Sequence, residues 1–556
     1  MAVIATAGHV DHGKSALVRA MTGIEPDRYA EERRRGLTLD LGFAHVASSD
    51  GTVLDIIDVP GHADYLRTMV AGIGLADIAL LAIDAVEGPR AQTREHLIAI
   101  ESAGIALGVI ALTRCDLVDD ARRSEVRAEV ARLAHASTVD WVAVVATSSV
   151  SGEGIDEAIE VLAALTVRVD TERGSHAGRP LRLVVDRSFH IAGSGTVVTG
   201  TLDSGVVRTG DRVTLLPSGV AATVRGLQRH GVAVDEVISR SRVALNLSGV
   251  SVEDVARGAV VVQPEAWMQT NTLDVGWVSE ANSFPPRVEV HLGAARRTAH
   301  VRPLALDGHA RLRFSPPLAL RPGDRLIVRS IGTGHVLGGA AVLDVDPVLR
   351  PSRARPDGSL ESLLAPHGWV RSAEAHRRVG HHVEDVIPGW IAAPSTVAAT
   401  VEALTAMLRH GPVALSERED FERLLLATMD DVTIEHGQAR QGARDPALDH
   451  PIVARLQHEG VTPGPLGDVD RATLGRLVRL GVFVTHDNVY FHRDTLVGLV
   501  PTLEQLWAEH PEGFTVSDLR TRLGITRKHA VPLAVCLDTC GYTRRIGDCR
   551  VRGRRD

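Results

Sequence analysis

Lysine is almost absent from this chain: of its 61 basic side chains, only Lys14 and Lys528 are lysines. Cysteine is also scarce. The four cysteines are too few for a disulfide framework and match no zinc-binding spacing, so we expect a reducing compartment, the cytoplasm. No run of about eighteen apolar residues occurs, and an apolar strand begins directly after the first residue, so we expect neither a membrane span nor a signal peptide. A chain of 556 residues is too long for one core and predicts several domains.

One of the two lysines lies in the stretch G-H-V-D-H-G-K-S at residues 8–15, which has the spacing of a phosphate-binding loop. The glycines let backbone N–H groups surround phosphate oxygens, and Lys14 supplies a compact ammonium for the β- and γ-phosphates. The apolar run Val3–Ala7 precedes the loop and the helical pattern Ala16–Met21 follows it, so the positive end of a helix faces the anion. The predicted nucleotide-binding residues of this loop are Asp11, His12, Gly13, Lys14, Ser15 and Ala16.

Three further motifs follow apolar strands in the order that a GTPase requires. D-V-P-G-H at 58–62 offers a carboxylate for a Mg²⁺-bound water, and the amide of Gly61 can meet the γ-phosphate. T-R-C-D at 113–116 ends in Asp116, whose carboxylate can accept two N–H groups from guanine but not from adenine. The segment 147–154 follows the fifth strand and can support the base. The GTP-binding residues predicted from these motifs are Asp58, Gly61, Thr113, Arg114, Asp116, Ser148 and Ser149.

The pattern of strands and helices predicts a multidomain architecture. The apolar strands expected up to about residue 170 are Val3–Ala7, Val53–Asp58, Ile78–Asp84, Gly108–Thr113 and Trp141–Thr147. Because helical stretches separate them, we expect a doubly wound parallel α/β sheet with ligands at the strand C-termini. Short alternating strands then predict two β-barrels, and helices return after residue 351. The expected domains are a GTP-binding (G) domain at 1–172, β-barrels at 179–264 and 268–348, and RNA-binding winged-helix repeats at 355–556, the last at about 497–556.

With these motifs in view, the N-terminal domain resembles the translational GTPases, on its phosphate loop, its D-V-P-G-H and the Q-T-R-E-H at 92–96. The base motif of that family is usually N-K-x-D. Here Thr113 replaces the asparagine and Arg114 replaces the lysine, while Asp116 is kept. An arginine can still stack on the guanine face, so we expect GTP and GDP as the nucleotides.

The same resemblance assigns roles around the γ-phosphate. The stretch 33–43 is similar to the first switch of the family, in which Thr38 would bind Mg²⁺ together with Ser15. His62 would position or activate the attacking water and is the predicted catalytic residue. An apolar gate beside His62 would consist of Val10 and Leu37.

The likeness that extends over the full length is to the SelB family of selenocysteine-specific elongation factors. It rests on E-E-R-R-R-G-L-T-L-D-L-G-F-A at 31–44, L-V-V-D-R-S-F at 183–189, G-T-V-V-T-G-T at 195–201 and R-V-A-L-N-L-S-G at 242–249. The resemblance implies that the aminoacyl end of the tRNA enters a pocket on the second domain. The matching positions are Asp186, Arg187 and Arg242. Two guanidinium groups would favour a selenolate anion over a neutral serine hydroxyl.

The C-terminal end is basic, although the whole chain has a net charge of −8. From residue 515 onward nine arginines and Lys528 face four aspartates, an excess of six positive charges. The order of helix, turn, helix and hairpin predicts a winged helix. By the resemblance, this module would bind a hairpin of the selenoprotein mRNA, through phosphates and an accessible base. The predicted RNA-contacting residues are Arg527, Lys528, Arg544, Arg545 and Arg550.

The resemblance therefore implies a monomeric, GTP-hydrolysing elongation factor whose partners are selenocysteyl-tRNA, the mRNA hairpin and the ribosome, with no membrane contact. Two other interpretations stay open at this point. A GTP-switched DNA-binding regulator is one, because winged helices commonly bind DNA. Another is an ordinary elongation or initiation factor with an unrelated C-terminal extension. The basic winged helix could also serve as a protein-interaction module.

Overall fold

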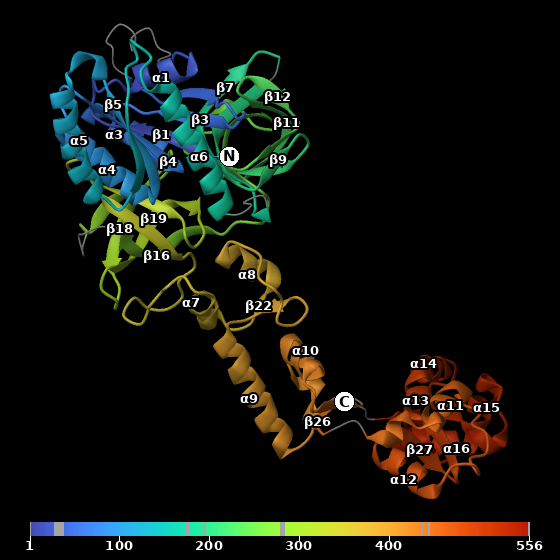
Figure 1. The fold of residues 1–556 in the computed structure, drawn as a ribbon. Coiled ribbons are helices and arrows are strands. Elements are labelled where there is room, and N and C mark those ends of the chain that lie inside the picture. The colour runs from blue at the N-terminus through green and yellow to red at the C-terminus, as the bar shows by residue number, and fades with distance from the viewer. Residues whose placement is uncertain are drawn as a thin grey trace. The chain divides into compact units, whose positions relative to one another are not determined.

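The computed structural model describes residues 2–26, 38–173, 178–193, 195–278, 284–435, 437–442 and 445–553. The chain divides into two compact units, Met1–Ala398 and Ala399–Asp556 (Figure 1). Among the described residues, no helix is both long enough and apolar enough to cross a membrane.

The G domain is an α/β fold whose sheet has the strand order β2-β3-β1-β4-β5-β6. The strands are β1 (Val3–Ala7), β2 (Gly42–Ala47), β3 (Val53–Asp58), β4 (Ile78–Asp84), β5 (Leu107–Thr113) and β6 (Asp140–Ala146). The helices are α1 (Lys14–Thr22), α3 (Leu66–Ile73), α4 (Ala91–Ala103), α5 (Asp120–His135) and α6 (Ile155–Arg173). The five predicted strands are confirmed, three of them with the predicted limits.

The five predicted strands pair in parallel, and the sheet has a sixth strand at one edge that the sequence did not predict. Strand β2 runs antiparallel to β3 and pairs Phe43 with Ile57, whereas the pairs among β1, β3, β4, β5 and β6 are parallel. Only one face of β2 is regularly buried, so its apolar signal is weak beside that of the central strands. The strand brings the end of the first-switch stretch back along the edge of the sheet.

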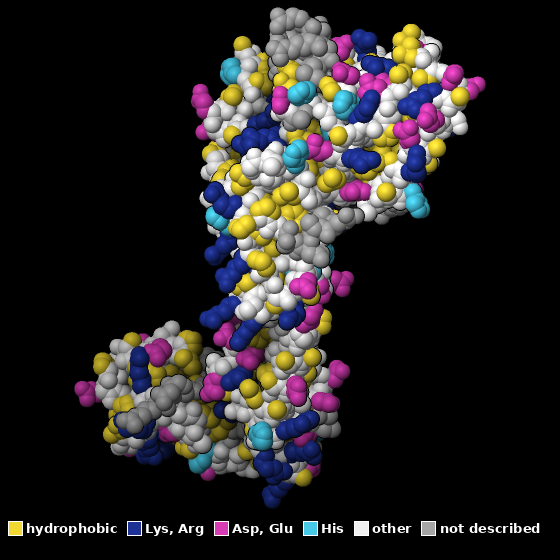
Figure 2. Space-filling model, turned by 90° about the vertical axis from the view of Figure 1, so that its left-hand side faces the viewer, with side chains coloured by type: hydrophobic (Ala, Val, Ile, Leu, Met, Phe, Trp, Pro, Cys, Tyr) yellow, Lys and Arg dark blue, Asp and Glu magenta, His cyan; other side chains and the backbone are white. Residues whose placement is uncertain are grey.

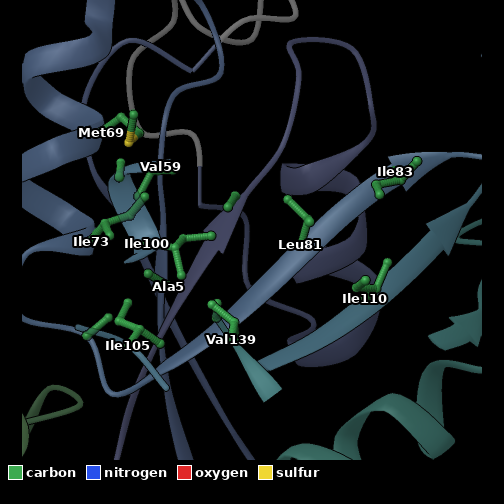
Figure 3. Packing of buried hydrophobic residues seen from close by; sticks show 14 of the residues in the cluster. Ala5, Val59, Met69, Ile73, Leu81, Ile83, Ile100, Ile105, Ile110 and Val139 are labelled. Carbon is green, nitrogen blue, oxygen red and sulfur yellow. The ribbon is translucent and has the colours of Figure 1, made fainter. Parts of the chain in front are cut away.

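Alternating side chains of the central strands form two apolar layers. On one face, Met69 and Ile73 of α3 and Ile100 of α4 lie in one buried cluster with Ala5 and Leu81 of the sheet (Figure 3). The next residues along the strands point to the opposite face, where α1 and α6 cover them. Each fully buried Leu or Ile side chain contributes roughly 1.5–3 kcal/mol to folding. This core fixes the strand ends from which the functional loops extend.

The second domain is a barrel in which the order β10-β15-β7-β8-β14-β11-β12 is closed by pairing of β10 with β11. Its strands are β7 (Arg182–Ile191), β8 (Gly195–Ser204), β9 (Val206–Arg208), β10 (Arg212–Leu216), β11 (Val220–Arg229), β12 (Val232–Val234), β13 (Glu236–Ile238), β14 (Ser241–Ser248) and β15 (Val260–Val262). Alternate residues of β14 are buried, which is the period-two pattern that the sequence predicted.

The third domain is a closed barrel with the order β16-β19-β18-β17-β20-β21. Its strands are β16 (Gln269–Val278), β17 (Arg287–Leu292), β18 (Ala295–Pro303), β19 (His309–Ala319), β20 (Arg325–Ser330) and β21 (Val336–Asp344). Its buried cluster also contains Leu75 of the G domain and Val184 of the second domain. The three domains therefore share apolar contacts within one unit.

Helices return after the barrels, as predicted. The first unit contains α7 (Leu360–Leu364), β22 (Val370–Arg371), α8 (Ser372–Val379) and β23 (Trp390–Ile391), and α9 (Pro394–His410) crosses the limit between the units. The second unit contains β24 (Val413–Ala414), α10 (Asp420–Thr428), β25 (Val432–Glu435), β26 (Gln438–Gln441), α11 (Pro451–Glu459), α12 (Arg471–Arg479), β27 (Phe483–His486), β28 (Val489–His492) and α13 (Arg493–Gly498).

The chain ends in a winged helix, as the sequence predicted. Its elements are α14 (Val500–Glu509), β29 (Phe514–Thr515), α15 (Val516–Leu523), α16 (Arg527–Thr539), β30 (Thr543–Ile546) and β31 (Cys549–Arg552). Thr515 caps α15 through its hydroxyl, and Gly524 ends that helix in the left-handed conformation, with φ 64°. The small sheet β29-β31-β30 forms the wing.

Candidate functional site

The phosphate-binding loop connects β1 to α1 and is held by glycines where side chains do not fit. Gly8 has a φ of 125°, and a Cβ there would lie 2.2 Å from the carbonyl oxygen of Ala82. Gly13 has a φ of 73° and directly precedes the first residue of α1. The loop therefore turns tightly, and the helix begins with its N–H groups at the loop, as anion binding requires.

Lys14 is buried in the loop. Its ammonium group donates hydrogen bonds to the carbonyl oxygens of Gly8 at 3.1 Å and His9 at 2.8 Å. Burial lowers the pKa of Lys14 to about 8, against the opposing attraction of Asp58. A phosphate group in the loop would favour the charged form of this lysine, so the site fits an anionic ligand.

Three oxygen-bearing side chains meet beside Lys14. The hydroxyl of Ser15 donates to Asp58 Oδ2 at 2.6 Å and lies 2.8 Å from the hydroxyl of Thr38. Thr6 donates to the other oxygen of Asp58 at 2.8 Å and so fixes this carboxylate. A set made only of oxygen ligands is the kind that Mg²⁺ prefers. The predicted metal residues Ser15 and Thr38 therefore lie together, and their chemistry fits the ion.

The loop after β3 packs against the phosphate loop at Gly61. A Cβ at Gly61 would lie 2.3 Å from the ammonium nitrogen of Lys14 and 2.7 Å from the backbone nitrogen of Val10. His62 follows directly. Its Nδ1 accepts a hydrogen bond from the backbone of Asp64 at 3.2 Å, and its side chain is 41% exposed. Val10 of the predicted gate thus lies beside this loop, whereas Leu37 lies outside the described residues.

Two residues of α4 support the phosphate loop from behind, and sequence reasoning assigned them no role. His96 Nδ1 accepts a hydrogen bond from the Gly8 N–H at 3.0 Å, and Gln92 Oε1 accepts one from Val10 at 3.1 Å. Burial lowers the pKa of His96 to about 3, so its ring is neutral and can accept. Both residues belong to the Q-T-R-E-H motif, and this was the one feature of the sequence that could have indicated their role.

His12 occupies the middle of the phosphate loop. Its ring is buried, and neither ring nitrogen has a hydrogen-bond partner among the described residues. Burial and the neighbouring His9 lower the pKa of His12 to about 4, so the ring is neutral. The side chain of Asp11 is exposed, and its backbone has a positive φ of 64°.

The two substituted residues of the base motif, Thr113 and Arg114, both contact neighbouring parts of the G domain. Thr113 donates its hydroxyl to the carbonyl oxygen of His12 at 2.8 Å, which ties β5 to the phosphate loop. Arg114 has a φ of 55° and binds the buried carboxylate of Asp84 at 2.7 Å. Asp116 is exposed at the same edge of the sheet. The carboxylate can therefore meet a base, while the two substituted residues hold the loop in place.

The last nucleotide motif forms a turn after β6. The buried hydroxyl of Ser148 accepts hydrogen bonds from the backbone of Val150 at 3.2 Å and Ser151 at 3.1 Å, whereas Ser149 is exposed. The backbone of Cys115 donates to the carbonyl oxygen of Thr147 at 3.2 Å. This turn therefore lies against the base motif.

The three residues of the predicted aminoacyl pocket converge in the structure. Arg242 on β14 donates to Asp186 on β7 at 3.0 Å and to Thr199 on β8 at 3.1 Å. The Cζ atoms of Arg242 and Arg187 lie 3.3 Å and 5.3 Å from the ring centroid of Phe43. One aromatic ring of the G domain thus contacts both guanidinium groups. The sequence did not point to Phe43.

The first-switch stretch continues directly into this pocket. Arg187 donates to Asp40 Oδ2 at 3.0 Å and to the carbonyl oxygen of Leu41 at 2.7 Å. Arg257 reaches the other oxygen of Asp40 at 3.3 Å. Thr38, which lies against Ser15, is only two residues before Asp40. The predicted nucleotide site and the predicted aminoacyl pocket are therefore connected by a few residues of backbone.

The winged helix exposes most of its predicted RNA-contacting residues. Arg527 and Lys528 are exposed at the first turn of α16, and Arg544 and Arg545 are exposed on the wing strand β30. Arg550 differs from the expectation. It is 3% exposed and donates to Asp538 at 3.0 Å, so it holds the wing against α16.

Basic and acidic side chains are interspersed over the face of the molecule that Figure 2 draws. The mixture is expected for a chain with 61 basic and 69 acidic residues. In such a chain, a binding site for a polyanion is indicated by a local cluster of basic residues and not by the net charge.

Comparison with known families agrees with this geometry. Residues 1–168 match the family of the elongation factor Tu GTP-binding domain, and 195–262 match elongation factor Tu domain 2. Residues 285–348 match the β-barrel domain of selenocysteine-specific elongation factors, and 505–552 match the winged helix of elongation factor SelB.

Three curated relatives carry the name selenocysteine-specific elongation factor. The Escherichia coli protein is 31% identical, and the match covers 98% of each chain. The Desulfomicrobium baculatum protein is 37% identical over 65% of this chain and 58% of its own length. The Haemophilus influenzae protein is 33% identical over 63% of this chain and 56% of its own length.

The fold agrees with solved structures. A bacterial selenocysteine-specific elongation factor, EF-Sec, matches with a TM-score of 0.64 and 26% identity over the full length of both chains. SelB of Methanococcus maripaludis, solved with the GTP analogue GppNHp, matches with a TM-score of 0.54 and 22% identity over 62% of this chain and 80% of its own. The third domain and the winged helix thus match models of selenocysteine-specific factors, and these matches favour neither the DNA-binding regulator nor an ordinary elongation or initiation factor. The chain belongs to the family of the GTP-dependent, selenocysteine-specific elongation factors.

Proposed function

We propose that this chain hydrolyses GTP and delivers selenocysteyl-tRNA to the ribosome at UGA codons that an mRNA hairpin marks. The observation that carries the proposal is the meeting of Arg187 and Arg242 over Phe43, in a chain of the selenocysteine-specific family. We further propose a cytoplasmic monomer with domain limits of 1–172, 179–264, 268–348 and 355–556.

The phosphate loop binds the nucleotide. Lys14 and the N–H groups at the start of α1 hold the phosphates, and Ser15, Thr38 and Asp58 provide the oxygen ligands and water contacts of a Mg²⁺ ion. The bound ion and nucleotide supply a transferable γ-phosphoryl group whose charge the ion partly neutralises. Because Thr38 belongs to the first-switch stretch, its contact with Ser15 makes the position of that stretch depend on the nucleotide site.

His62 orients the water that attacks the γ-phosphate. Gly61 places this loop against Lys14 and Val10, so His62 follows at the edge of the phosphate site. In this structure its ring bonds the backbone of Asp64, and 41% of the side chain is exposed. We propose that ribosome binding turns the ring toward the water. Catalysis would therefore depend on the ribosome, while nucleotide binding would not depend on His62.

Asp116 selects guanine. Its exposed carboxylate accepts the two N–H groups of the guanine edge, and Arg114 lies beside the base. Thr113 ties the base motif to the phosphate loop through its hydrogen bond to the carbonyl oxygen of His12. The altered motif is thus compatible with GTP and GDP.

The pocket selects selenocysteine by charge. A selenol is a stronger acid than a thiol, so the side chain of selenocysteine is an anion at neutral pH. Arg187 and Arg242 supply two guanidinium groups, and Asp186 orients Arg242 through a 3.0 Å hydrogen bond. A charge-assisted hydrogen bond is worth about 1.5–3 kcal/mol, whereas a neutral serine hydroxyl gains much less from the same groups.

The winged helix binds the mRNA hairpin. Arg527, Lys528, Arg544 and Arg545 are exposed and can reach RNA phosphates, while the buried Arg550 supports the wing. Removal of residues after about Pro501 should abolish hairpin binding and leave GTP and tRNA binding intact. A truncated chain that still bound the hairpin would indicate that this module instead binds protein.

Reconstituted translation tests the whole proposal. The template carries an in-frame UGA followed by the hairpin from a selenoprotein gene, and a matched template lacks the hairpin. We expect the chain to insert selenocysteine only on the first template, and only with GTP. Insertion of serine from the same tRNA at a similar rate, or insertion without the hairpin, would contradict the assignment.

A further inference from the structure

A cavity of about 380 Å³ lies between the G domain and both barrels. Its lining includes Leu75 after α3, Gly104 after α4, Arg182 on β7 and the loop 321–325 between β19 and β20. We call it the junction cavity. Because Leu75 precedes β4, the cavity lies at the N-terminal edge of the sheet, opposite the edge that carries the phosphate loop. It is therefore separate from the nucleotide site.

Positive charge dominates this cavity. The arginines that line it are Arg179, Arg182, Arg240, Arg321 and Arg325, and the lining carboxylates are Asp203 and Asp324. Asp77, whose carboxylate lies 3.3 Å from Arg240, adds a third negative charge. Five guanidinium groups thus face three carboxylates, which leaves two positive charges in excess.

Arg182 uses both lining carboxylates. Its Nε donates to Asp203 at 3.0 Å, its Nη2 donates to Asp324 at 2.8 Å, and its Nη1 donates to the carbonyl oxygen of Ala319 at 3.0 Å. The side chain is 1% exposed. Burial opposes the charged form, but the two carboxylates more than offset it and raise the pKa of Arg182. This ion triad is complete and leaves little negative charge for the other arginines.

Arg321 is buried without comparable compensation. Its side chain is 8% exposed, its Nε is 3.5 Å from Asp324, and its Nη1 has no hydrogen-bond partner among the described residues. Burial and the nearby charge of Arg182 lower the pKa of Arg321 to about 10. A buried guanidinium nitrogen without an acceptor is costly, so Nη1 of Arg321 favours a ligand that supplies one.

Two neighbouring arginines, Arg240 and Arg179, also have more positive charge around them than nearby carboxylates offset. The Nε of Arg240 is buried and has no partner in the described part of the chain, and its Nη1 is 3.3 Å from Asp77. Burial and the charge of Arg240 lower the pKa of Arg179. Arg179 and Arg325 are exposed, so they lie where a ligand from solvent would enter.

We propose that the junction cavity binds a small phosphate-bearing anion. Guanidinium groups match phosphate oxygens with pairs of parallel N–H bonds, and several of them converge here from two barrels. A volume of about 380 Å³ is within the range of small-ligand sites and accommodates phosphate or pyrophosphate. Because the lining also includes the G domain, the bound anion holds the three domains in one arrangement.

Calorimetric titration of the full chain tests this site. The nucleotide site is first saturated with GDP, and Mg²⁺ is kept in excess over all phosphates. Inorganic phosphate and pyrophosphate are then titrated at constant ionic strength. We expect saturable binding with one site per chain for at least one of these anions. Arg321→Gln should weaken it by about 10- to 150-fold, the value of one charge-assisted hydrogen bond.

Two further variants serve as a second test of the cavity and as a matched control. Arg325→Gln leaves the buried triad intact and should also weaken binding, which covers the case in which Arg321→Gln does not fold. Arg297→Gln is the matched control, because Arg297 bonds the carbonyl oxygen of Pro316 at 2.7 Å on the third domain and does not line the cavity. Absence of saturable binding, or equal affinity in Arg325→Gln and Arg297→Gln, would overturn the proposal. So would parallel release of a fluorescent GDP analogue, which would place the anion in the phosphate loop.

Discussion

Under the proposed function, replacement of Arg242 by alanine should separate the recognition of selenocysteine from the binding of the tRNA body. The change removes one of the two guanidinium groups at Phe43, together with the bonds to Asp186 at 3.0 Å and Thr199 at 3.1 Å. Arg187 keeps its contacts with Asp40 and Leu41, so the rest of the pocket retains its anchor.

Two effects of Arg242→Ala differ in size and in selectivity. Loss of a charge-assisted hydrogen bond to a selenolate costs about 1.5–3 kcal/mol, which is a factor of about 10–150 in affinity. Loss of the cation–π contact with Phe43, 3.3 Å from the ring centroid, costs about 0.5–1 kcal/mol and weakens the pocket for any aminoacyl group. The selenocysteyl form should therefore lose much more affinity than the seryl form.

The assay compares dissociation rates of selenocysteyl-tRNA and seryl-tRNA with identical tRNA bodies, in the presence of GppNHp. Arg257→Ala is the matched control, because Arg257 contacts Asp40 at 3.3 Å, is 44% exposed and belongs to the same domain. We expect the ratio of the two affinities to fall about 10–150-fold in Arg242→Ala and to change little in Arg257→Ala. Equal weakening of both aminoacyl-tRNAs by Arg242→Ala would refute the charge mechanism and place Arg242 against the tRNA body.

Four more outcomes are expected from the proposed roles of individual residues. His62→Ala should keep GTP affinity and reduce ribosome-stimulated, single-turnover hydrolysis by about 10²–10⁴; an unchanged rate on ribosomes would remove His62 from catalysis. Asp116→Asn should shift preference from GTP toward XTP in competition binding, because the acceptor pair becomes an amide, and an unchanged ratio would show that Asp116 does not contact the base. Arg544 and Arg545 changed to alanine should reduce the slope of log K against log salt for hairpin RNA by about one unit per lost contact, and an undiminished slope would contradict phosphate binding. The pKa of His96 is about 3 in the folded chain, against an ordinary value of 6.5 in the unfolded chain. Between these two pH values the unfolded chain therefore binds more protons than the folded chain. As pH falls from 6.5 toward 3, the free energy of unfolding of the G domain should decrease by about 1.4 kcal/mol per pH unit because of this group. Hydrogen exchange of β1 and α1 amides should show a shallower loss of stability in His96→Gln. An identical pH profile in the two proteins would mean that folding does not shift the pKa of His96.

The strands of the nucleotide-binding sheet were predictable because they are buried apolar runs that end at polar motifs. Strands β1, β3 and β4 begin and end where the sequence places them. The motif residues at their C-termini then necessarily meet at one edge of the sheet. Strand β2 lacked such a signal, since it is an edge strand with one buried face and lies beside the switch motif.

The supporting contacts were not predictable from spacing. His96 bonds the phosphate loop from a helix 88 positions away, and Phe43 reaches the arginines of another domain. Both depend on tertiary packing, which no local pattern encodes. Arg550 shows the converse case. A basic residue in a basic segment is expected at the surface, but its ion pair with Asp538 places it inside the wing.

The short stretch from Thr38 to Phe43 has a thermodynamic consequence for the two proposed ligands of the first unit, the nucleotide and the aminoacyl-tRNA. Its first residue lies against Ser15, its middle binds Arg187 through Asp40, and its last lies under Arg242. A nucleotide that stabilises these three contacts of the stretch raises the affinity for the aminoacyl-tRNA by some factor. Reciprocity of binding free energies then requires the tRNA to raise the affinity for that nucleotide by the same equilibrium factor. Under the proposed function, bound aminoacyl-tRNA therefore helps to retain GTP, just as GTP helps to retain the aminoacyl-tRNA.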